Sequence, residues 1–223
     1  MTPRVLGAPP TSVFYVVPLM AGLAVWAAFL AGRRLAGPGT GLATALLTAA
    51  SPVFLYQAAQ PMSDVPATAW WLVALALAGR RTRPALLANG AAAGVAVLMR
   101  PNLAPLVGLL VAYAALRLEG EPAGTPPRLE RMVTVAAGAA PAALCVALVQ
   151  WVVYGSPLRS GYGSLEALFE LAHVTPNLER YVPWLLQTQS PLILASLVTP
   201  AAMWRRAARR DAWYATLVAG FAA

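Results

Sequence analysis

The chain has 223 residues, of which 59% are hydrophobic and only 11% are charged. Its mean hydropathy is +0.64, which excludes an ordinary soluble domain, because such domains carry about 25% charged residues. The formal net charge is +8 and all sixteen basic residues are arginines. Most of these arginines lie between hydrophobic runs, a pattern that indicates membrane topology rather than nucleic-acid binding.

The sequence predicts an all-α fold, a polytopic transmembrane helix bundle of about seven or eight spans in a single domain over residues 1–223. Apolar runs separated by Arg, Gly and Pro place helices at 12–32, 38–56, 64–79, 84–99, 102–116, 132–154 and 185–204. An eighth helix begins near Asp211. Pro52 and Pro141 are expected to kink their helices or to end them early.

Arginine placement predicts the orientation of these helices. If the first helix runs into the cytoplasm, twelve arginines occupy cytoplasmic loops, and the four that remain outside are Arg4, Arg100, Arg159 and Arg180. Cytoplasmic loops are normally the arginine-rich ones. We therefore expect an extracytoplasmic N-terminus and one long extracytoplasmic segment at about 155–184.

The ends of the chain suggest a fragment. No signal peptide precedes the first apolar run, although the N-terminus is expected outside. The last apolar run, at 212–223, is only about half as long as the roughly 20 residues that span a bilayer. We expect a chain that is truncated at both ends.

Two short helices point to a candidate site. The helices at 64–79 and 84–99 have about 16 residues each and extend roughly 24 Å, which is less than the hydrocarbon thickness of about 30 Å. The loops at 57–63 and 100–101 are therefore expected below the outer membrane surface. Non-helical backbone at that depth is found where protein or a water-filled cavity covers it.

Asp64 is the acidic residue at this recessed boundary. Two interpretations stay open: it is a helix N-cap only, or it is a site residue, because ionisable groups near hydrocarbon are costly. Arg100 has three possible partners, namely Asp64, a lipid phosphate, and the interface to which it would snorkel. Gln60, in the same loop as Asp64, and Tyr162, in the long outer segment, are candidate substrate-binding residues.

Metal and cofactor chemistry is not expected. Cys145 is the single cysteine and His173 is the single histidine, so neither a disulfide nor a clustered metal site is indicated. Ser164 is expected to cap a short amphipathic helix in the outer segment. That helix would lie on the membrane surface or form a lid over the site.

The order of these elements resembles a known family. A helix ending in SPVFLYQAAQPMSDVPA, an arginine-rich turn and a helix ending in LMRPN resemble bacterial family 39 glycosyltransferases of the GT-C superfamily, which are related to dolichyl-phosphate-mannose protein mannosyltransferases. The later WVVYGSPLRSGYG is similar to a segment in bacterial members. The resemblance extends over about 39–184.

The resemblance implies a multi-pass enzyme of the inner cell membrane. It would transfer a sugar from a polyprenyl-phosphate donor to a lipid, polysaccharide or protein acceptor at the outer face. Arg100 resembles the basic residue that faces the donor phosphate, and Asp64 resembles an auxiliary acidic residue near the active site. The family's main catalytic base is expected upstream of this chain, so the fragment is expected to be inactive alone.

Two other classes of function remain open from the residues. Many spans and short helices also suit a transporter or flippase subunit, which usually has interrupted helices in two matching halves. A noncatalytic membrane scaffold would use Asp64 and Arg100 only as a structural pair. The lipid bilayer and the donor are the expected partners, nucleic acid is not, and the sequence does not indicate the oligomeric state.

Overall fold

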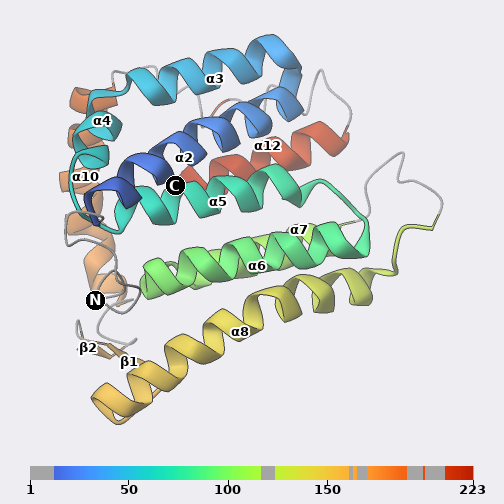
Figure 1. Ribbon diagram of the computed structural model, residues 1–223, viewed down its shortest axis with the longest axis vertical. Helices are drawn as coiled ribbons and strands as arrows, with labels where there is room; N and C mark the ends of the chain where they lie inside the picture. The colour runs from blue at the N-terminus through green and yellow to red at the C-terminus, as the bar shows by residue number, and fades with distance from the viewer. Residues whose placement is uncertain are drawn as a thin grey trace.

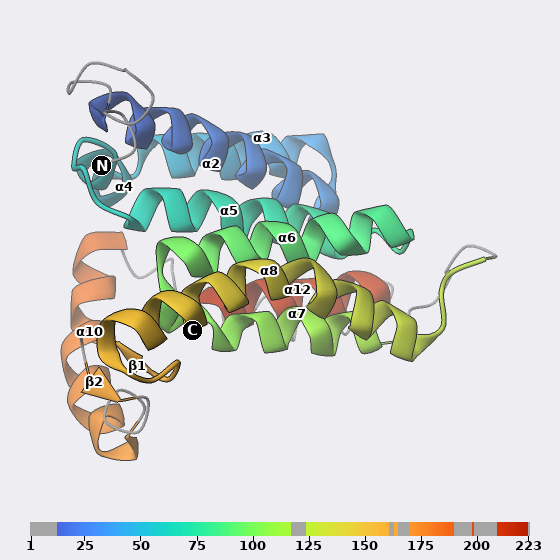
Figure 2. The same cartoon turned by 60° about the horizontal axis from the view of Figure 1, so that its bottom comes forward.

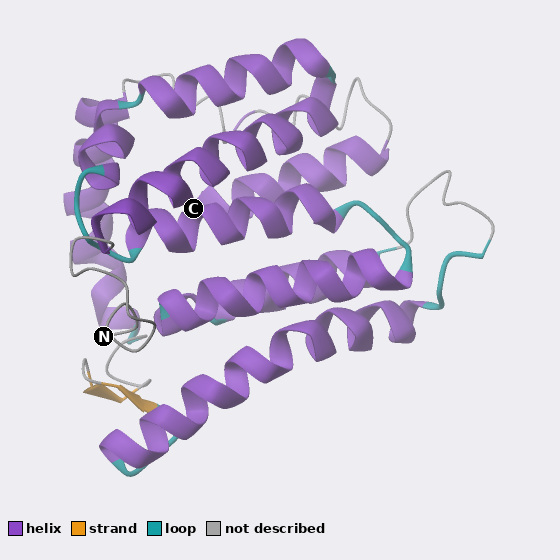
Figure 3. Cartoon of the chain, in the orientation of Figure 1, coloured by secondary structure: helices purple, strands orange, loops and turns teal. Residues whose placement is uncertain are grey.

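The computed structural model describes residues 13–116, 124–160, 163–164, 170–189, 198 and 209–222, and helices dominate them (Figure 3). The α-helices are α2 (Val13–Ala36), α3 (Pro38–Ala50), α4 (Pro52–Ala58), α5 (Asp64–Ala78), α6 (Arg83–Met99), α7 (Pro105–Ala115), α8 (Arg128–Tyr154), α10 (Val174–Gln189) and α12 (Arg209–Ala222). The short elements are the 3-10 helices η2 (Pro101–Leu103) and η3 (Leu171–His173), and the strands β1 (Arg159–Ser160) and β2 (Gly163–Ser164). The strands pair antiparallel, with Arg159 opposite Ser164.

The long helices form a bundle (Figure 1). Helix α2 packs between α3 and α5, α5 packs on α6, and α6 packs on α8. Helices α7 and α12 cover the back of this row and contact each other. One end of the bundle, which we call the arginine end, holds the C-termini of α2, α5 and α7 and the N-termini of α6, α8 and α12. The opposite end, which we call the outer end, holds α4, the N-terminus of α5 and the C-terminus of α6.

The predicted helix at 38–56 is interrupted. Helices α3 and α4 meet at Ser51 with a bend of 62°. Ser51 is extended, with φ −64° and ψ 120°, because a residue before proline is disfavoured in the α region, and Pro52 then starts the next helix. The Ser51 hydroxyl accepts a hydrogen bond from the Phe54 amide at 3.4 Å. The expected effect of Pro52 is confirmed, whereas α8 continues through Pro141.

Two other predicted helices are wrong in their bounds. The run at 102–116 begins with the 3-10 turn η2 and becomes α-helical only at Pro105, because prolines at 101 and 105 remove amide donors. The helix expected at 185–204 corresponds, where the structure describes it, to α10, which begins eleven residues earlier at Val174. The short amphipathic helix expected after Ser164 falls largely outside the described residues, and Ser164 itself lies in β2.

Two helices are long and apolar enough to cross a membrane, at Phe14–Ala36 and Arg128–Tyr154. The bent pair α3 and α4 gives a third if it counts as one span. Helices α5, α6 and the η2–α7 segment are shorter and apolar. The chain is therefore a helical protein with two or three candidate membrane spans in its described part, and the number of seven or eight spans stays a prediction.

Glycines allow α6 and α8 to pack backbone against backbone. A Cβ added at Gly90 would lie 2.0 Å from the Val135 carbonyl oxygen, and one added at Gly138 would lie 2.3 Å from the Leu87 carbonyl oxygen. Such contacts are possible only without a side chain. Because lipid tails are as apolar as Leu, close approach of this kind drives helix association in membranes.

Two buried arginines hold the C-terminus of α7. Arg81 is 7% exposed and donates from Nη1 and Nη2 to the Tyr113 carbonyl, at 3.4 and 3.3 Å, and from Nη1 to the Ala114 carbonyl at 3.2 Å. Its guanidinium also lies over the Tyr113 ring, 4.9 Å from the centroid. The last carbonyls of a helix have no partner within the helix, so these contacts satisfy groups that would otherwise be buried unpaired.

Arg131 completes the same cap from α8. It is 4% exposed, and its Nε donates to the Ala114 carbonyl at 2.8 Å. Its Nη2 and Nη1 donate to the carbonyls of Leu116 and Pro126, both at 2.9 Å. Three separate segments, the α5–α6 turn, the end of α7 and the start of α8, are thereby tied together at the arginine end.

Arg34 links the beginning of the chain to α12. Its guanidinium lies over the Tyr214 ring at 4.9 Å from the centroid, and it also packs against Gly79, where an added Cβ would collide with it. The Tyr214 hydroxyl donates to the Leu75 carbonyl at 3.0 Å. Helix α12 is therefore fixed to α2 and α5 by one cation–π contact and one buried hydrogen bond.

Replacement of Gly90 by Ala should lower the free energy of unfolding by about 1–3 kcal/mol, because the added methyl group forces α6 and α8 apart. Gly108→Ala in α7 is the matched control, since a Cβ there meets nothing within 4 Å. Unfolding of both variants in mixed detergent micelles measures the difference. Equal losses in the two variants would contradict close packing of α6 on α8.

Replacement of Arg131 by Met should cost about 3 kcal/mol of unfolding free energy, because buried carbonyls at the end of α7 lose their donors. Arg128→Gln is the control. Arg128 is one turn earlier on the same helix and exposed, so its replacement should change stability by no more than about 0.5 kcal/mol. Similar stabilities of the two variants would show that Arg131 is dispensable as a cap.

Candidate functional site

Asp64 and Arg100 form an ion pair at the outer end of the bundle. Arg100 donates from Nη1 to Oδ1 of Asp64. The Asp64 side chain is 33% exposed and the Arg100 side chain 39% exposed. The structure therefore brings together the two residues that the sequence singled out, and it shows Asp64 as a partner of Arg100. Both side chains remain open to a molecule that approaches this end.

Arg100 is positioned by the end of α6. It is the C-cap residue, and its amide donates to the Ala96 carbonyl at 2.9 Å. Its backbone is extended, with φ −141° and ψ 91°, as expected for a residue that precedes a proline. The chain turns away from the helix axis at this point, and η2 follows directly. The guanidinium is thus placed where a membrane helix ends and irregular backbone begins.

Asp64 is the first residue of α5, and the N-cap position belongs to Ser63. The interpretation of Asp64 as the N-cap residue is therefore wrong by one position. A carboxylate in the first turn still interacts favourably with the helix dipole. In the described hydrogen bonds its side chain meets Arg100 rather than a backbone amide, so α5 contributes a charge to the site instead of using it to cap its own end.

A small apolar cluster fixes the start of α5. Val65 is buried against Val17 and Ala21 of α2, and Phe54 and Ala58 of α4 pack against the same group. Side chains on three helices thus hold the loop at 59–63 between them. This packing sets the position of Asp64 relative to α2 and α4, while α5 and α6 pack along their lengths and set its distance from Arg100.

Of the other two predicted site residues, the structure describes only Gln60. Gln60 lies in the loop between α4 and α5 and is half-buried. Its backbone amide donates to the Gln57 backbone carbonyl at 3.1 Å, and its backbone carbonyl accepts from the Met62 amide at 2.8 Å. Among the described residues, no hydrogen bond joins the Gln60 side chain to Asp64 or Arg100. Tyr162 lies outside the described residues.

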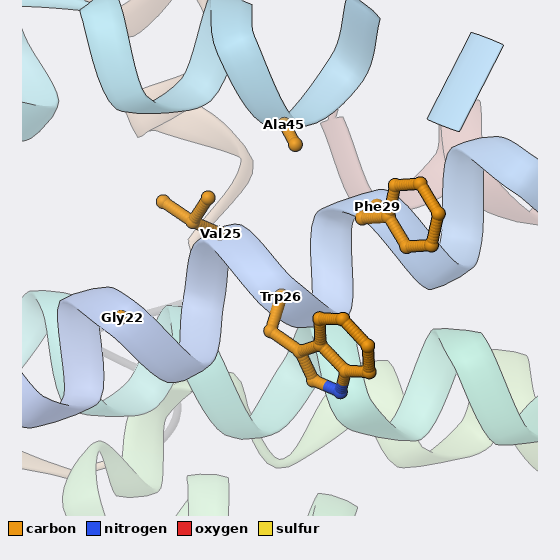
Figure 4. Close-up of a pocket in the computed structure, with 5 residues that line it drawn as sticks. All are labelled: Gly22, Val25, Trp26, Phe29 and Ala45. Carbon is orange, nitrogen blue, oxygen red and sulfur yellow. The ribbon is translucent and has the colours of Figure 1, made fainter. Parts of the chain in front are cut away.

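Two open grooves on the surface are lined by other residues than this pair. One is bordered by Gly22, Val25, Trp26, Phe29 and Ala45, between α2 and α3 (Figure 4). Ala45 points from α3 toward α2, and the Trp26 and Phe29 rings are stacked with centroids 5.7 Å apart. This lining is apolar and carries no acid or base, so the groove does not offer the proton or phosphate chemistry that Asp64 and Arg100 offer.

The described residues contain no group of three metal-ligating side chains. The chemistry that the Asp64–Arg100 pair itself offers is that of one carboxylate and one guanidinium. A guanidinium has five N–H donors in a planar fork, and one nitrogen of Arg100 is used by Asp64. The remaining donors suit an anionic oxygen, above all a phosphate, which guanidinium binds in bidentate geometry.

Two arginines at the opposite end have a role that sequence reasoning missed. Arg81 and Arg131 were interpreted only as loop charges that mark topology, yet both are buried caps of α7. A signal was present, since each arginine lies within four residues of a predicted helix boundary, next to a proline- or glycine-containing turn. Their partner carbonyls, up to 33 residues away, could not be identified without the structure.

A sequence model of one known family matches the chain. The model is described as dolichyl-phosphate-mannose-protein mannosyltransferase, and it matches residues 2–121, which is more than half of the 223 residues. The matched part contains Asp64 and Arg100. A search of curated proteins and a search of solved structures each found no match.

A double-mutant cycle on Asp64→Ala and Arg100→Ala should give a coupling energy of about 1 kcal/mol in unfolding free energy, the upper part of the range for partly exposed pairs. Arg83 and Glu130 form the comparison pair at the arginine end, with Arg83 72% exposed. Solvent screens that pair more strongly, so its coupling should be smaller. Additive effects at Asp64 and Arg100 would mean that the two charges do not interact in the membrane.

Proposed function

The chain belongs to the dolichyl-phosphate-mannose-protein mannosyltransferase family, and we propose that it takes part in sugar transfer from a polyprenyl-phosphate-linked donor at the extracytoplasmic face of the inner cell membrane. The acceptor is a lipid, a polysaccharide or a protein. Family membership and membrane-crossing helices support a membrane glycosyltransferase. The Asp64–Arg100 pair at the outer end is the observation that supports a specific location for the site.

The position of the pair suits a lipid-linked donor. The polyprenyl chain stays in the bilayer while the phosphate and the sugar lie near the headgroups. Asp64 and Arg100 lie at the ends of α5 and α6, which have 15 and 17 residues and therefore extend only about 22 and 26 Å. Helices of this length end near or below the membrane surface. A donor phosphate could reach Arg100 at that depth without leaving the membrane.

The proposed chemistry assigns a role to each charge. An acceptor hydroxyl attacks the anomeric carbon of the sugar, the bond from that carbon to the phosphate oxygen breaks, and the polyprenyl phosphate leaves with the negative charge. Arg100 stabilises this charge through charge-assisted hydrogen bonds. The hydroxyl proton passes to a base, for which Asp64 is an auxiliary candidate only.

The second role of Asp64 is to orient Arg100. Its carboxylate holds one nitrogen of the guanidinium, which limits the conformations of a long side chain before the donor binds. Prior ordering of this kind reduces the entropy that binding must overcome. Gln60 and Tyr162 remain proposed contacts to the sugar or the acceptor.

The two rival functions make different demands. A transporter usually has interrupted helices in two corresponding halves, whereas the described residues contain a single bent pair, α3 and α4. A scaffold would need the ion pair only for stability. Neither rival requires a free guanidinium edge at the outer end, so the effect of Arg100 on sugar transfer separates the enzyme from both.

In the full-length protein in liposomes, Arg100→Ala should lower kcat/KM for a polyprenyl-phosphate sugar by about 30-fold, which corresponds to about 2 kcal/mol for a charge-assisted phosphate contact. Arg100→Lys should recover only part of the loss, because an ammonium group keeps the charge but not the bidentate geometry. Radiolabelled sugar transfer to the extracted acceptor measures the rates.

Arg128→Gln is the control for this experiment, since it removes an exposed arginine at the opposite end of the bundle. Transfer by this variant should equal that of the parent protein. Donor kinetics that are unchanged in Arg100→Ala, at normal expression, would remove Arg100 from the donor site. An absence of transfer by the parent protein with every polyprenyl-phosphate sugar would argue against the enzyme itself.

A further inference from the structure

Helix α10 differs from the rest of the bundle in its direction. Figures 1 and 2 both show it nearly perpendicular to α2, α5, α6 and α8, across the outer end. It has 16 residues and is therefore about 24 Å long. If the bundle helices cross a membrane, a helix at right angles to them at one end lies parallel to the membrane plane.

The side chains of α10 are divided between two faces. Val174, Leu178, Tyr181 and Leu185 follow one another at intervals of four, three and four residues, which places them on one face of an α-helix. The opposite face carries Glu179, Arg180 and Gln187. No other helix of the described chain separates apolar and polar residues as clearly, because the bundle helices are apolar nearly all round.

Three of the four residues on the apolar face of α10 are not covered by the described parts of the chain, and Leu185 is half-buried. Val174 is 48% exposed, Leu178 58% and Tyr181 52%. The main neighbour of α10 is η3, whose Leu171 is itself 86% exposed. Exposed apolar residues that are scattered singly need no explanation, but a continuous stripe along one helix face indicates a contact with something apolar.

We propose that α10 is an interfacial helix that inserts its Val174–Leu178–Tyr181 face into the outer leaflet of the membrane. Its orientation favours lipid as the occupant, because a helix across the ends of membrane-crossing helices meets the headgroup region along its whole length. Its aromatic residues also favour this position, since Tyr181 and Trp184 belong to the residue types that are enriched at membrane surfaces. Glu179 and Arg180 then face water and phosphate groups.

This placement has a consequence for the Asp64–Arg100 pair, which lies at the same end of the bundle. A surface helix resists both deeper insertion and withdrawal of the bundle, because either movement exposes apolar residues to water or places Glu179 and Arg180 in hydrocarbon. Helix α10 thereby sets the depth of the outer end relative to the headgroups. The inference about α10 does not depend on sugar transfer.

Site-directed spin labelling tests the proposal in liposomes of the full-length protein. Cys145 is first replaced by alanine, and a nitroxide is attached at Leu178→Cys or, as the matched control on the opposite face, at Arg180→Cys. Oxygen concentrates in lipid and a nickel chelate stays in water, so the two relaxation agents report the surroundings of each label. The parent protein labelled at Cys145, which is exposed on α8, gives the reference for lipid.

The label at position 178 should respond to oxygen severalfold more than to nickel, and the label at position 180 should show the reverse preference. A nickel response that dominates at both positions would place α10 in water and overturn the proposal. A label at 178 that neither agent reaches would mean that protein covers the face, which also overturns it. An unfolding midpoint equal to that of the parent protein confirms that both labelled variants are folded.

Discussion

The chain must satisfy its backbone hydrogen bonds without water wherever its helices end inside or near the membrane, and the rest of the structure depends on this constraint. A helix leaves four donors and four acceptors unpaired at its ends, and each unpaired group in hydrocarbon costs several kcal/mol. Helix α7 has only 11 residues, so both its ends are close to apolar surroundings. Its C-terminus is satisfied by Arg81 and Arg131, which are nearly fully buried.

The two ends of the bundle use arginine in opposite ways. At the arginine end, Arg81 and Arg131 donate hydrogen bonds to backbone carbonyls and are buried, so other molecules do not reach them. At the outer end, Arg100 shares one nitrogen with Asp64 and keeps more than a third of its side chain exposed. The same residue type is thus a structural cap where it is buried and a candidate binding group where it is open, and burial rather than charge separates the two roles.

The sequence predicted the features that depend on local patterns. The bounds of α5 and α6 agree within a residue or two with the expected helices, because apolar runs flanked by Asp, Arg and Pro define both ends. The pairing of Asp64 with Arg100 was among the expected alternatives, since the two short helices are adjacent in the chain and antiparallel. In a hairpin of two antiparallel helices of similar length, the start of the first helix lies beside the end of the second, which brings Asp64 and Arg100 together.

Features that depend on distant contacts were missed. Helix α10 begins inside the segment at about 155–184 for which only a short helix after Ser164 was expected, and it contains Pro176 and Pro183. A proline in the first turn of a helix is tolerated, and the amphipathic pattern continues past both prolines. The partners of Arg81 and Arg131 were equally out of reach. The number of arginines in each loop predicts the side of the membrane on which the loop lies, but it does not identify the carbonyl that each guanidinium binds.

The contacts of α12 have a consequence for the way the chain is made. Tyr214 donates to the carbonyl of Leu75, 139 residues earlier, and ribosomes add roughly 5–20 residues per second, so α5 waits roughly 7–30 s for this partner. During that interval the guanidinium of Arg34 lacks the Tyr214 ring that lies against it in the structure. The hydrogen bond and the cation–π contact that fix α12 therefore form only after the helices at the start of the chain have been synthesised.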